Sequence, residues 1–156
     1  MAGNANLSEV CLVIISGTAM DCLAWLKKNY HSFSRLDGLL FLSLGAALQS
    51  SHSDWLRSRL KNKKIILLFG RDVLGRITDL KVAAAINDIS LEVYIEGDEN
   101  IAVYYRSRRF LFSPENLSLN ALDKASGYRF NLACRKPLQH NTFFDELLDH
   151  AGLLIK

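Results

Sequence analysis

The stretch VCLVIISG at residues 10–17 decides the fold class of this chain. It is a continuous apolar run, rich in β-branched side chains, that ends in a small polar residue and a glycine. A strand with one solvated face alternates apolar and polar residues, whereas a strand buried on both faces of a parallel sheet is an unbroken apolar run. The stretch therefore predicts a buried strand over residues 10–15.

Two more runs of the same kind follow at residues 39–44 and 65–69, and a glycine comes after each. Helical segments are predicted between and after them, over residues 19–30, 53–61 and 78–86. The first of these begins after Thr18, which forms a capping box with Asp21. Its predicted apolar stripe consists of Ala19, Leu23 and Leu26. Strand and helix alternate with short connections, which predicts parallel strand pairing with right-handed crossovers.

The pattern changes after Ser90. Residues 91–96 alternate, which is typical of a strand with one solvated face. A turn at residues 97–100 then predicts a returning strand over 101–105, with a helix as the alternative there. The remaining predicted elements are a helix that starts at Ser113 and Pro114, a strand over residues 128–133, and a helix over residues 142–148 capped by Thr142.

Together these elements predict an α/β fold. We expect a three-layer sandwich with a mainly parallel sheet, built on a βαβαβ core of the DsrE-like or flavodoxin-like kind, and a C-terminal α+β extension. The expected division is a core over residues 1–105 and an extension over residues 106–156 that packs on the same domain.

The composition fits one ordinary globular domain. The chain has 156 residues, of which 49% are hydrophobic and 22% charged, so it does not belong to the disordered class. The net charge of +3 is too small to predict nucleic acid or an anionic membrane as a partner. No basic residue precedes the first apolar run, and the stretch at residues 36–48 is short for a bilayer span. We expect a cytoplasmic protein without membrane contact.

Metal and cofactor signals are missing from the sequence. The three cysteines are widely spaced and odd in number, which argues against a disulfide framework or a zinc site and favours reduced thiols. The four histidines have no ligand spacing. Neither a P-loop nor a dinucleotide-binding glycine pattern occurs. We therefore expect no metal and no cofactor.

Candidate binding residues follow the predicted parallel strands, because ligands of such sheets lie beyond the carboxyl ends of the strands. These ends are residues 16–18, 45–47 and 70–72. The candidates at these ends and in the loop after the third strand are Thr18, Gly45, Asp72 and Arg76. For Asp72 and Arg76 the alternative is a local ion pair that organises the loop and contributes little stability.

Cys22 is the candidate catalytic residue. It falls near the start of the first predicted helix, where unpaired backbone N–H groups and the helix dipole stabilise a thiolate, the reactive form of cysteine. The neighbouring Asp21 opposes that effect. The alternative is that Cys22 is a small core residue, as free cysteines usually are. Cys11, inside a predicted buried strand, is expected to serve packing alone.

A basic cluster is the third candidate site. Arg106, Arg108 and Arg109 are flanked by Tyr104, Tyr105 and Phe110, and cations interleaved with aromatic rings are typical of proteins that bind single-stranded nucleic acid. The more common explanation of such a cluster is a solvated strand end.

Four segments together resemble the sulfur-relay family typified by DsrE, DsrF and DsrH, and specifically its DsrH/TusB branch. They are residues 18–23 with the first-helix cysteine, 36–48 with the second strand, 65–77 with the third strand and its turn, and 89–94 with the fourth strand. The likeness covers about residues 9–105. Leu44 stands where the branch usually has an acidic residue, the turn's glycine and arginine are displaced to Gly75 and Arg76, and residues 106–156 extend beyond the usual end of the branch.

The resemblance implies a sulfur carrier that passes sulfane sulfur as a persulfide on Cys22. Such a carrier works in a homo- or hetero-oligomer, with other DsrE-like subunits or with a sulfur donor or acceptor protein, although some members of the branch are structural subunits. Two alternatives stay open. One is a non-catalytic protein-interaction module on the same fold, and the other is a protein that binds single-stranded nucleic acid through residues 106–110.

Overall fold

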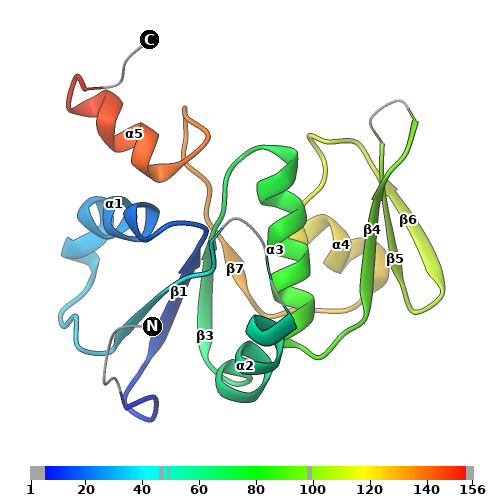
Figure 1. Ribbon diagram of the computed structural model, residues 1–156, viewed down its shortest axis with the longest axis horizontal. Coiled ribbons are helices and arrows are strands. Elements are labelled where there is room, and N and C mark those ends of the chain that lie inside the picture. The colour runs from blue at the N-terminus through cyan, green and yellow to red at the C-terminus, as the bar shows by residue number, and fades with distance from the viewer. Residues whose placement is uncertain (1–5, 46–47, 49, 98–99, 154–156) are drawn as a thin grey trace. The chain divides into compact units, whose positions relative to one another are not determined.

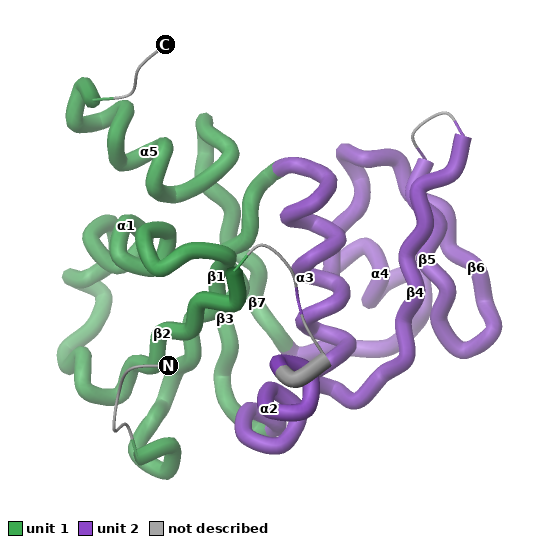
Figure 2. Tube along the Cα trace, in the orientation of Figure 1, with its two compact units in different colours: residues 1–47, 62–71, 132–156 green, residues 48–61, 72–131 purple. Residues whose placement is uncertain are grey.

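The computed structural model describes residues 6–45, 48, 50–97 and 100–153. The chain forms two compact units, of which the first comprises residues 1–47, 62–71 and 132–156, and the second residues 48–61 and 72–131 (Figure 2). Each unit therefore combines segments from distant parts of the sequence. The division into a core and an extension at residue 105 stays a prediction.

The first unit is built on a four-stranded parallel sheet (Figure 1). Its strand order is β2-β1-β3-β7, and the strands are β1 (Leu12–Ser16), β2 (Leu39–Ser43), β3 (Lys64–Leu68) and β7 (Ala133–Cys134). In the register, Ile14 of β1 lies between Phe41 of β2 and Ile66 of β3. The three apolar runs therefore form adjacent parallel strands, as predicted.

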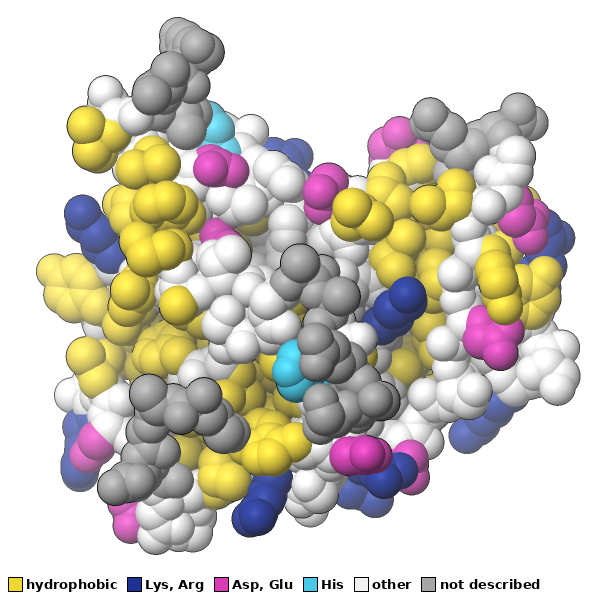
Figure 3. All heavy atoms as spheres, viewed as in Figure 1, with side chains coloured by type: hydrophobic (Ala, Val, Ile, Leu, Met, Phe, Trp, Pro, Cys, Tyr) yellow, Lys and Arg dark blue, Asp and Glu magenta, His cyan; other side chains and the backbone are white. Residues whose placement is uncertain are grey.

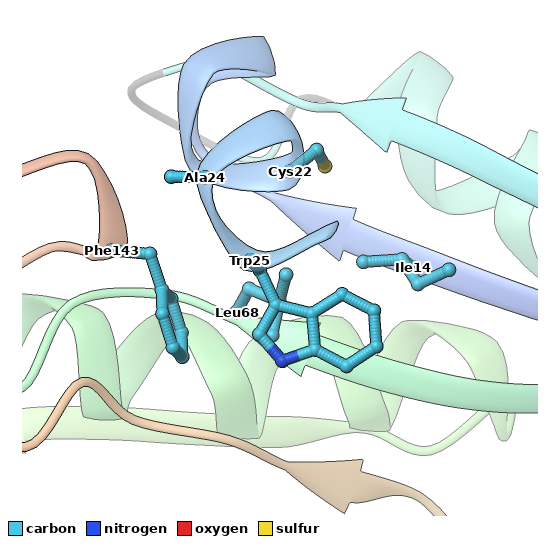
Figure 4. Close-up of a cluster of buried hydrophobic side chains, with 6 residues drawn as sticks. All are labelled: Ile14, Cys22, Ala24, Trp25, Leu68 and Phe143. Atoms are coloured by element: carbon cyan, nitrogen blue, oxygen red, sulfur yellow. The ribbon is translucent and has the colours of Figure 1, made fainter. Parts of the chain in front are cut away.

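Helices α1 (Ala19–Asn29) and α5 (Phe143–His150) belong to the same unit, together with the short 3-10 helix η1 (Tyr30–Ser32). The core against them is a cluster of buried side chains from β1, α1, β3 and α5 (Figure 4). Its members are Ile14, Cys22, Ala24, Trp25, Leu68 and Phe143. These burials supply most of the stability of such a unit, because each large apolar side chain removed from water contributes about 1.5–3 kcal/mol.

Helix α1 begins and ends as predicted but buries a different face. The Thr18 side chain accepts a hydrogen bond from the Asp21 N–H, which confirms the cap. The predicted apolar stripe is wrong, since Ala19 is exposed and Leu23 keeps 57% of its surface exposed, while Cys22 and Trp25 are buried. Apolar residues occur on both sides of this helix, so periodicity alone could not select the buried face.

The second unit contains a three-stranded antiparallel sheet in the order β4-β5-β6. Its elements are α2 (Ser50–Leu60), α3 (Val73–Ile86), β4 (Leu91–Ile95), β5 (Ile101–Tyr105), β6 (Arg108–Phe112) and α4 (Leu119–Ser126). The returning strand at residues 101–105 is confirmed. Residues 89–94, which resemble the fourth strand of the sulfur-relay family, supply β4 here, while the fourth strand of the parallel sheet is β7. Asp98 and Glu99 of the predicted turn lie outside the described residues.

Several helix boundaries differ from the predictions. Helix α3 begins at Val73 because Asp72 accepts a hydrogen bond from the Gly75 N–H, and Thr78 instead donates to the Leu74 carbonyl inside the helix. Helix α2 begins at Ser50, before the predicted cap at residues 53–54. The predicted helix start at Ser113 is wrong, since those residues form a turn.

The last predicted elements divide into one error and one success. Helix α4 begins only at Leu119, where Ser118 caps it. The strand predicted over residues 128–133 is instead β7, which contains Ala133 and Cys134 alone, and Asn131 before it has a left-handed backbone (φ 57°). Helix α5 is confirmed with its cap, as the Thr142 side chain accepts from the Asp145 N–H.

The predicted α/β class is confirmed at the level of a parallel sheet flanked by helices, joined in the same chain by an antiparallel sheet. Among the described residues, every helix is too short or too polar to cross a membrane.

Candidate functional site

The carboxyl edge of the parallel sheet has a topological switch point between β1 and β3. From β1 the chain crosses to β2 on one side, and from β2 it crosses to β3 on the other. Ligands of open α/β sheets bind beyond the strand ends at such a point, because the diverging loops leave a crevice there. Ser16 ends β1 and Gly17 follows it at this point, and Phe69 and Gly70 follow β3.

The loops after β1 and β2 are hydrogen bonded to each other beside this point. The Leu44 N–H donates to the Ser16 carbonyl (3.0 Å), and the Gly45 N–H donates to the Gly17 carbonyl (3.0 Å). A Cβ on Gly17 would lie 3.6 Å from the Gly45 carbonyl oxygen and 3.9 Å from the Phe69 ring. Gly45 has φ +76°, a left-handed conformation that favours glycine. Of the predicted loop residues, Ala46 and Ala47 lie outside the described part of the chain.

The chain's own C-terminal segment covers the end of β3. The Lys136 Nζ donates to the carbonyls of Phe69 (3.0 Å) and Gly70 (2.8 Å). Arg71 is held from both sides, since its N–H donates to the Asn141 carbonyl (3.0 Å) and its guanidinium donates to the Leu138 carbonyl. We call residues 135–141 the strap. Its hydrogen bonds occupy main-chain groups of residues 69–71, directly after β3.

Two buried carboxylates anchor the chain that follows the strap. Asp21, 6% exposed, accepts from the Thr18 hydroxyl (2.6 Å) and from the Phe144 N–H (3.1 Å), so one side chain joins the starts of α1 and α5. Glu146, 3% exposed, forms an ion pair with Lys28 and accepts from the Leu138 N–H (2.6 Å).

The environment of Glu146 makes its charged form the stable one. Burial alone raises the pKa of Glu146, but the hydrogen bonds from Lys28 and from the Leu138 N–H, together with the Lys28 charge, outweigh burial and hold the pKa below its ordinary value. The carboxylate therefore stays ionised at neutral pH and fixes both α5 and the strap.

Cys22 lies in the core beneath this edge as a neutral thiol. It is 2% exposed, and its Sγ is 3.0 Å from the Ser16 Oγ. The Ser16 hydroxyl donates to the Thr18 carbonyl (2.5 Å), so the proton between Ser16 and Cys22 belongs to the sulfur. Burial raises the pKa of Cys22 above its ordinary value, Ser16 lowers it less, and the Asp21 charge raises it again. These surroundings oppose the thiolate expected from the helix position and favour the core alternative.

The predicted binding residues fall into two groups. Thr18 and Gly45 lie together at the carboxyl edge of the first unit. Asp72 and Arg76 belong to the second unit, where Asp72 caps α3 and Arg76 donates to the carbonyls of Glu115 (2.8 Å) and Leu117 (2.9 Å). Asp72 and Arg76 thus tie α3 to its surrounding loops.

The three arginines of the basic cluster point to different surroundings. Arg106 lies over the rings of Tyr105 (5.1 Å) and Tyr128 (5.7 Å), and Arg108 lies over Phe110 (5.0 Å) on the face of the sheet opposite to Arg109. Arg109 forms an ion pair with Glu96. Residues 106 and 107 both have positive φ and form the turn between β5 and β6. The cluster therefore does not form one cationic track.

Sequence patterns missed the groups that close the edge. Lys136 and Asn141 follow a two-residue strand with no periodic signal, and Asp21 was recognised only as part of a helix cap. Their partners lie far along the chain, and local patterns carry no information about such contacts. Cys11 is a further correction, because it precedes β1 and is exposed.

Comparisons with known proteins leave the family open. A scan against protein-family models, a search of curated proteins and a search of solved structures each found no match for this chain. The sulfur-relay resemblance accordingly stays a prediction that rests on the four sequence segments.

Proposed function

We propose that this chain is a non-catalytic protein-interaction module on a parallel α/β sheet. The observation that carries the proposal is the strap, which bonds the chain's own residues to the main chain directly after β3, one of the two strands that border the switch point where α/β proteins hold substrates and cofactors. A catalytic site needs accessible reactive groups and room for a substrate. Here Cys22, the candidate nucleophile, is buried with a raised pKa.

The strand order supports a specific kind of α/β fold. The order β2-β1-β3 begins the flavodoxin-like arrangement, and β7 takes the place of its fourth strand. We propose that the first unit is a variant of the DsrE-like, flavodoxin-like sandwich in which a short strand from the C-terminal segment completes the sheet. The free thiols fit a reducing, cytoplasmic compartment.

A persulfide carrier is the second candidate function. The observation that favours it is the Ser16 hydroxyl at 3.0 Å from the Cys22 Sγ, which could rotate to stabilise a thiolate or a persulfide anion. This function requires Cys22 to become accessible in a complex with other DsrE-like subunits or with a sulfur donor protein.

Persulfidation of the native chain separates the two functions. A Cys11→Ser/Cys134→Ser variant, which retains only Cys22, is incubated with inorganic polysulfide and its intact mass is measured. We expect no added sulfur in the native protein and one or more added sulfur atoms once the chain is unfolded in urea, because burial withholds the thiol. Addition to the native protein at a rate close to that of the unfolded chain would contradict the interaction-module proposal and favour the carrier.

A further inference from the structure

Helix α1 presents a second apolar face that no described residue of the first unit covers. Met20, Leu23 and Tyr30 keep 45%, 57% and 62% of their surfaces exposed. Met20 and Leu23 lie on one side of α1, opposite to buried Cys22 and Trp25, and Tyr30 follows as the C-cap residue of the helix and the first residue of η1. Single exposed apolar residues are ordinary, but an aligned row on one helix marks a contact surface.

A groove between α1 and α5 continues this row. It has a volume of about 230 Å³, and Ala24, Phe143 and Leu147 are among the side chains that line it. Figure 3 shows apolar side chains gathered over α1 and α5. The exposed row and the groove together are called the α1–α5 face.

The charge left over on the α1–α5 face is positive. Glu146 lines the groove but is neutralised by Lys28. Lys27, also at the groove, has no hydrogen bond or ion pair with any other described residue. His150 completes the rim, where its Nδ1 bonds to the Glu146 carbonyl oxygen (2.6 Å), and Lys27 is therefore the uncompensated charge among the described side chains that line the groove. A partner that covers this face therefore needs acidic groups next to an apolar stripe.

We propose that the α1–α5 face binds an acidic amphipathic helix of a partner protein, an inference that rests on the proposed interaction function. A groove between two helices fits a third helix, whose apolar residues at positions i, i+3, i+4 and i+7 enter it. Acidic residues beside that stripe would meet Lys27. A second copy of this chain fits poorly, because pairing the same face by a two-fold axis would place an uncompensated Lys27 on both sides of the contact and would supply no unpaired acid to either.

The test uses three synthetic helical peptides with the 156-residue chain. The first carries leucine at i, i+3, i+4 and i+7 with glutamate elsewhere, the second has lysine in place of glutamate, and the third is a scrambled form of the first. Binding is followed by fluorescence anisotropy, and the contact surface by amide chemical-shift changes. We expect the acidic peptide to bind at least about tenfold more tightly than the other two, with shifts confined to α1 and α5.

Matched variants locate the binding. Lys27→Glu and Leu23→Ser alter exposed side chains and should weaken the acidic peptide about tenfold without loss of folding. Leu111→Ser, at a residue 52% exposed in the second unit, is the control and should change nothing. The proposal is overturned if the acidic peptide does not bind, if the scrambled peptide binds equally, or if the shifts fall outside α1 and α5.

Sedimentation velocity measures whether the chain forms a dimer through the α1–α5 face. A stable dimer that is lost in Leu23→Ser would show that a second copy covers the face, and would overturn the acidic-helix proposal while leaving the interaction function intact. Persulfidation of native Cys22 would instead overturn the interaction function, whatever the peptides do. The two failures are therefore distinguishable.

Discussion

The two sheets of this chain differ in how far their faces are buried. In β1 of the parallel sheet, every residue from Val13 to Ser16 is buried, and the residues after β3 are hydrogen bonded to the strap. In the antiparallel sheet, Tyr94, Tyr104 and Leu111 remain 53%, 37% and 52% exposed on one face. The parallel sheet thus serves stability and positioning, whereas the antiparallel sheet leaves an apolar face on the surface.

Charged side chains on the exposed face of the antiparallel sheet have hydrogen-bond or ion-pair partners within it. Tyr94 and Tyr104 form an edge-to-face pair with ring centroids 5.7 Å apart, and the Tyr94 hydroxyl donates to Glu92 (2.9 Å). Arg109 pairs with Glu96. This face therefore lacks the excess of cations that a nucleic-acid surface requires, despite its rings.

The largest contrast between the sheets should appear in stability. Ile14→Ala removes a side chain that is fully buried in the parallel sheet, and we expect it to lower the free energy of unfolding by about 3 kcal/mol. Leu111→Ala on the exposed face should cost about 0.5 kcal/mol or less. Urea unfolding measures both, and equal losses would show that the exposed face is in fact covered.

The anchors of the strap predict a pH dependence. The folded pKa of Glu146 is lowered from its ordinary value of 4.5, so its contribution to stability is full above that value and is lost as the pH falls through the folded pKa. Lys28→Met should destabilise the protein by about 1–2 kcal/mol at neutral pH, a figure reduced because the Lys28 side chain is 48% exposed.

The matched control for this prediction is Glu146→Gln, which keeps the shape but cannot ionise. Unfolding free energies are measured from pH 7 down to pH 3 for the three proteins. Both variants should lose part of the acid dependence of the unmodified chain. A pH profile unchanged in Glu146→Gln would contradict the assignment of this carboxylate as an anchor.

Sequence patterns predicted the strands of the parallel sheet better than the contacts at the carboxyl edge of that sheet. The runs that became β1, β2 and β3 are apolar throughout, and Thr18 and Thr142 have capping partners three residues away, so each signal is local. The start of α3 was missed because two polar residues could cap it, and only the structure shows that Asp72 does. The burial of Asp21 depends on Phe144, a contact that no local pattern contains.

The accessibility of the Cys22 thiol tests whether the carboxyl edge of the parallel sheet is closed to solvent. Cys22→Ser places a hydroxyl where the thiol is 2% exposed, and we expect a loss of about 1 kcal/mol in unfolding free energy. Iodoacetamide at neutral pH should label exposed Cys11 first, partly buried Cys134 more slowly and Cys22 last. Labelling of Cys22 as fast as Cys11 would mean that the edge opens readily.

The smallest effect is expected at the exposed face of the antiparallel sheet, in an assay for single-stranded nucleic acid. Since Arg109 is neutralised by Glu96 and the three arginines diverge, oligothymidine should not be retarded in a low-salt gel, and Arg109→Ala should change nothing. Glu96→Gln removes the ion pair of Arg109 beside Tyr104 and tests whether the Glu96 carboxylate prevents binding of single-stranded nucleic acid. If the unmodified chain retards oligothymidine and both Arg109→Ala and Tyr104→Ala abolish the retardation, the exposed face is instead a surface on which bases stack.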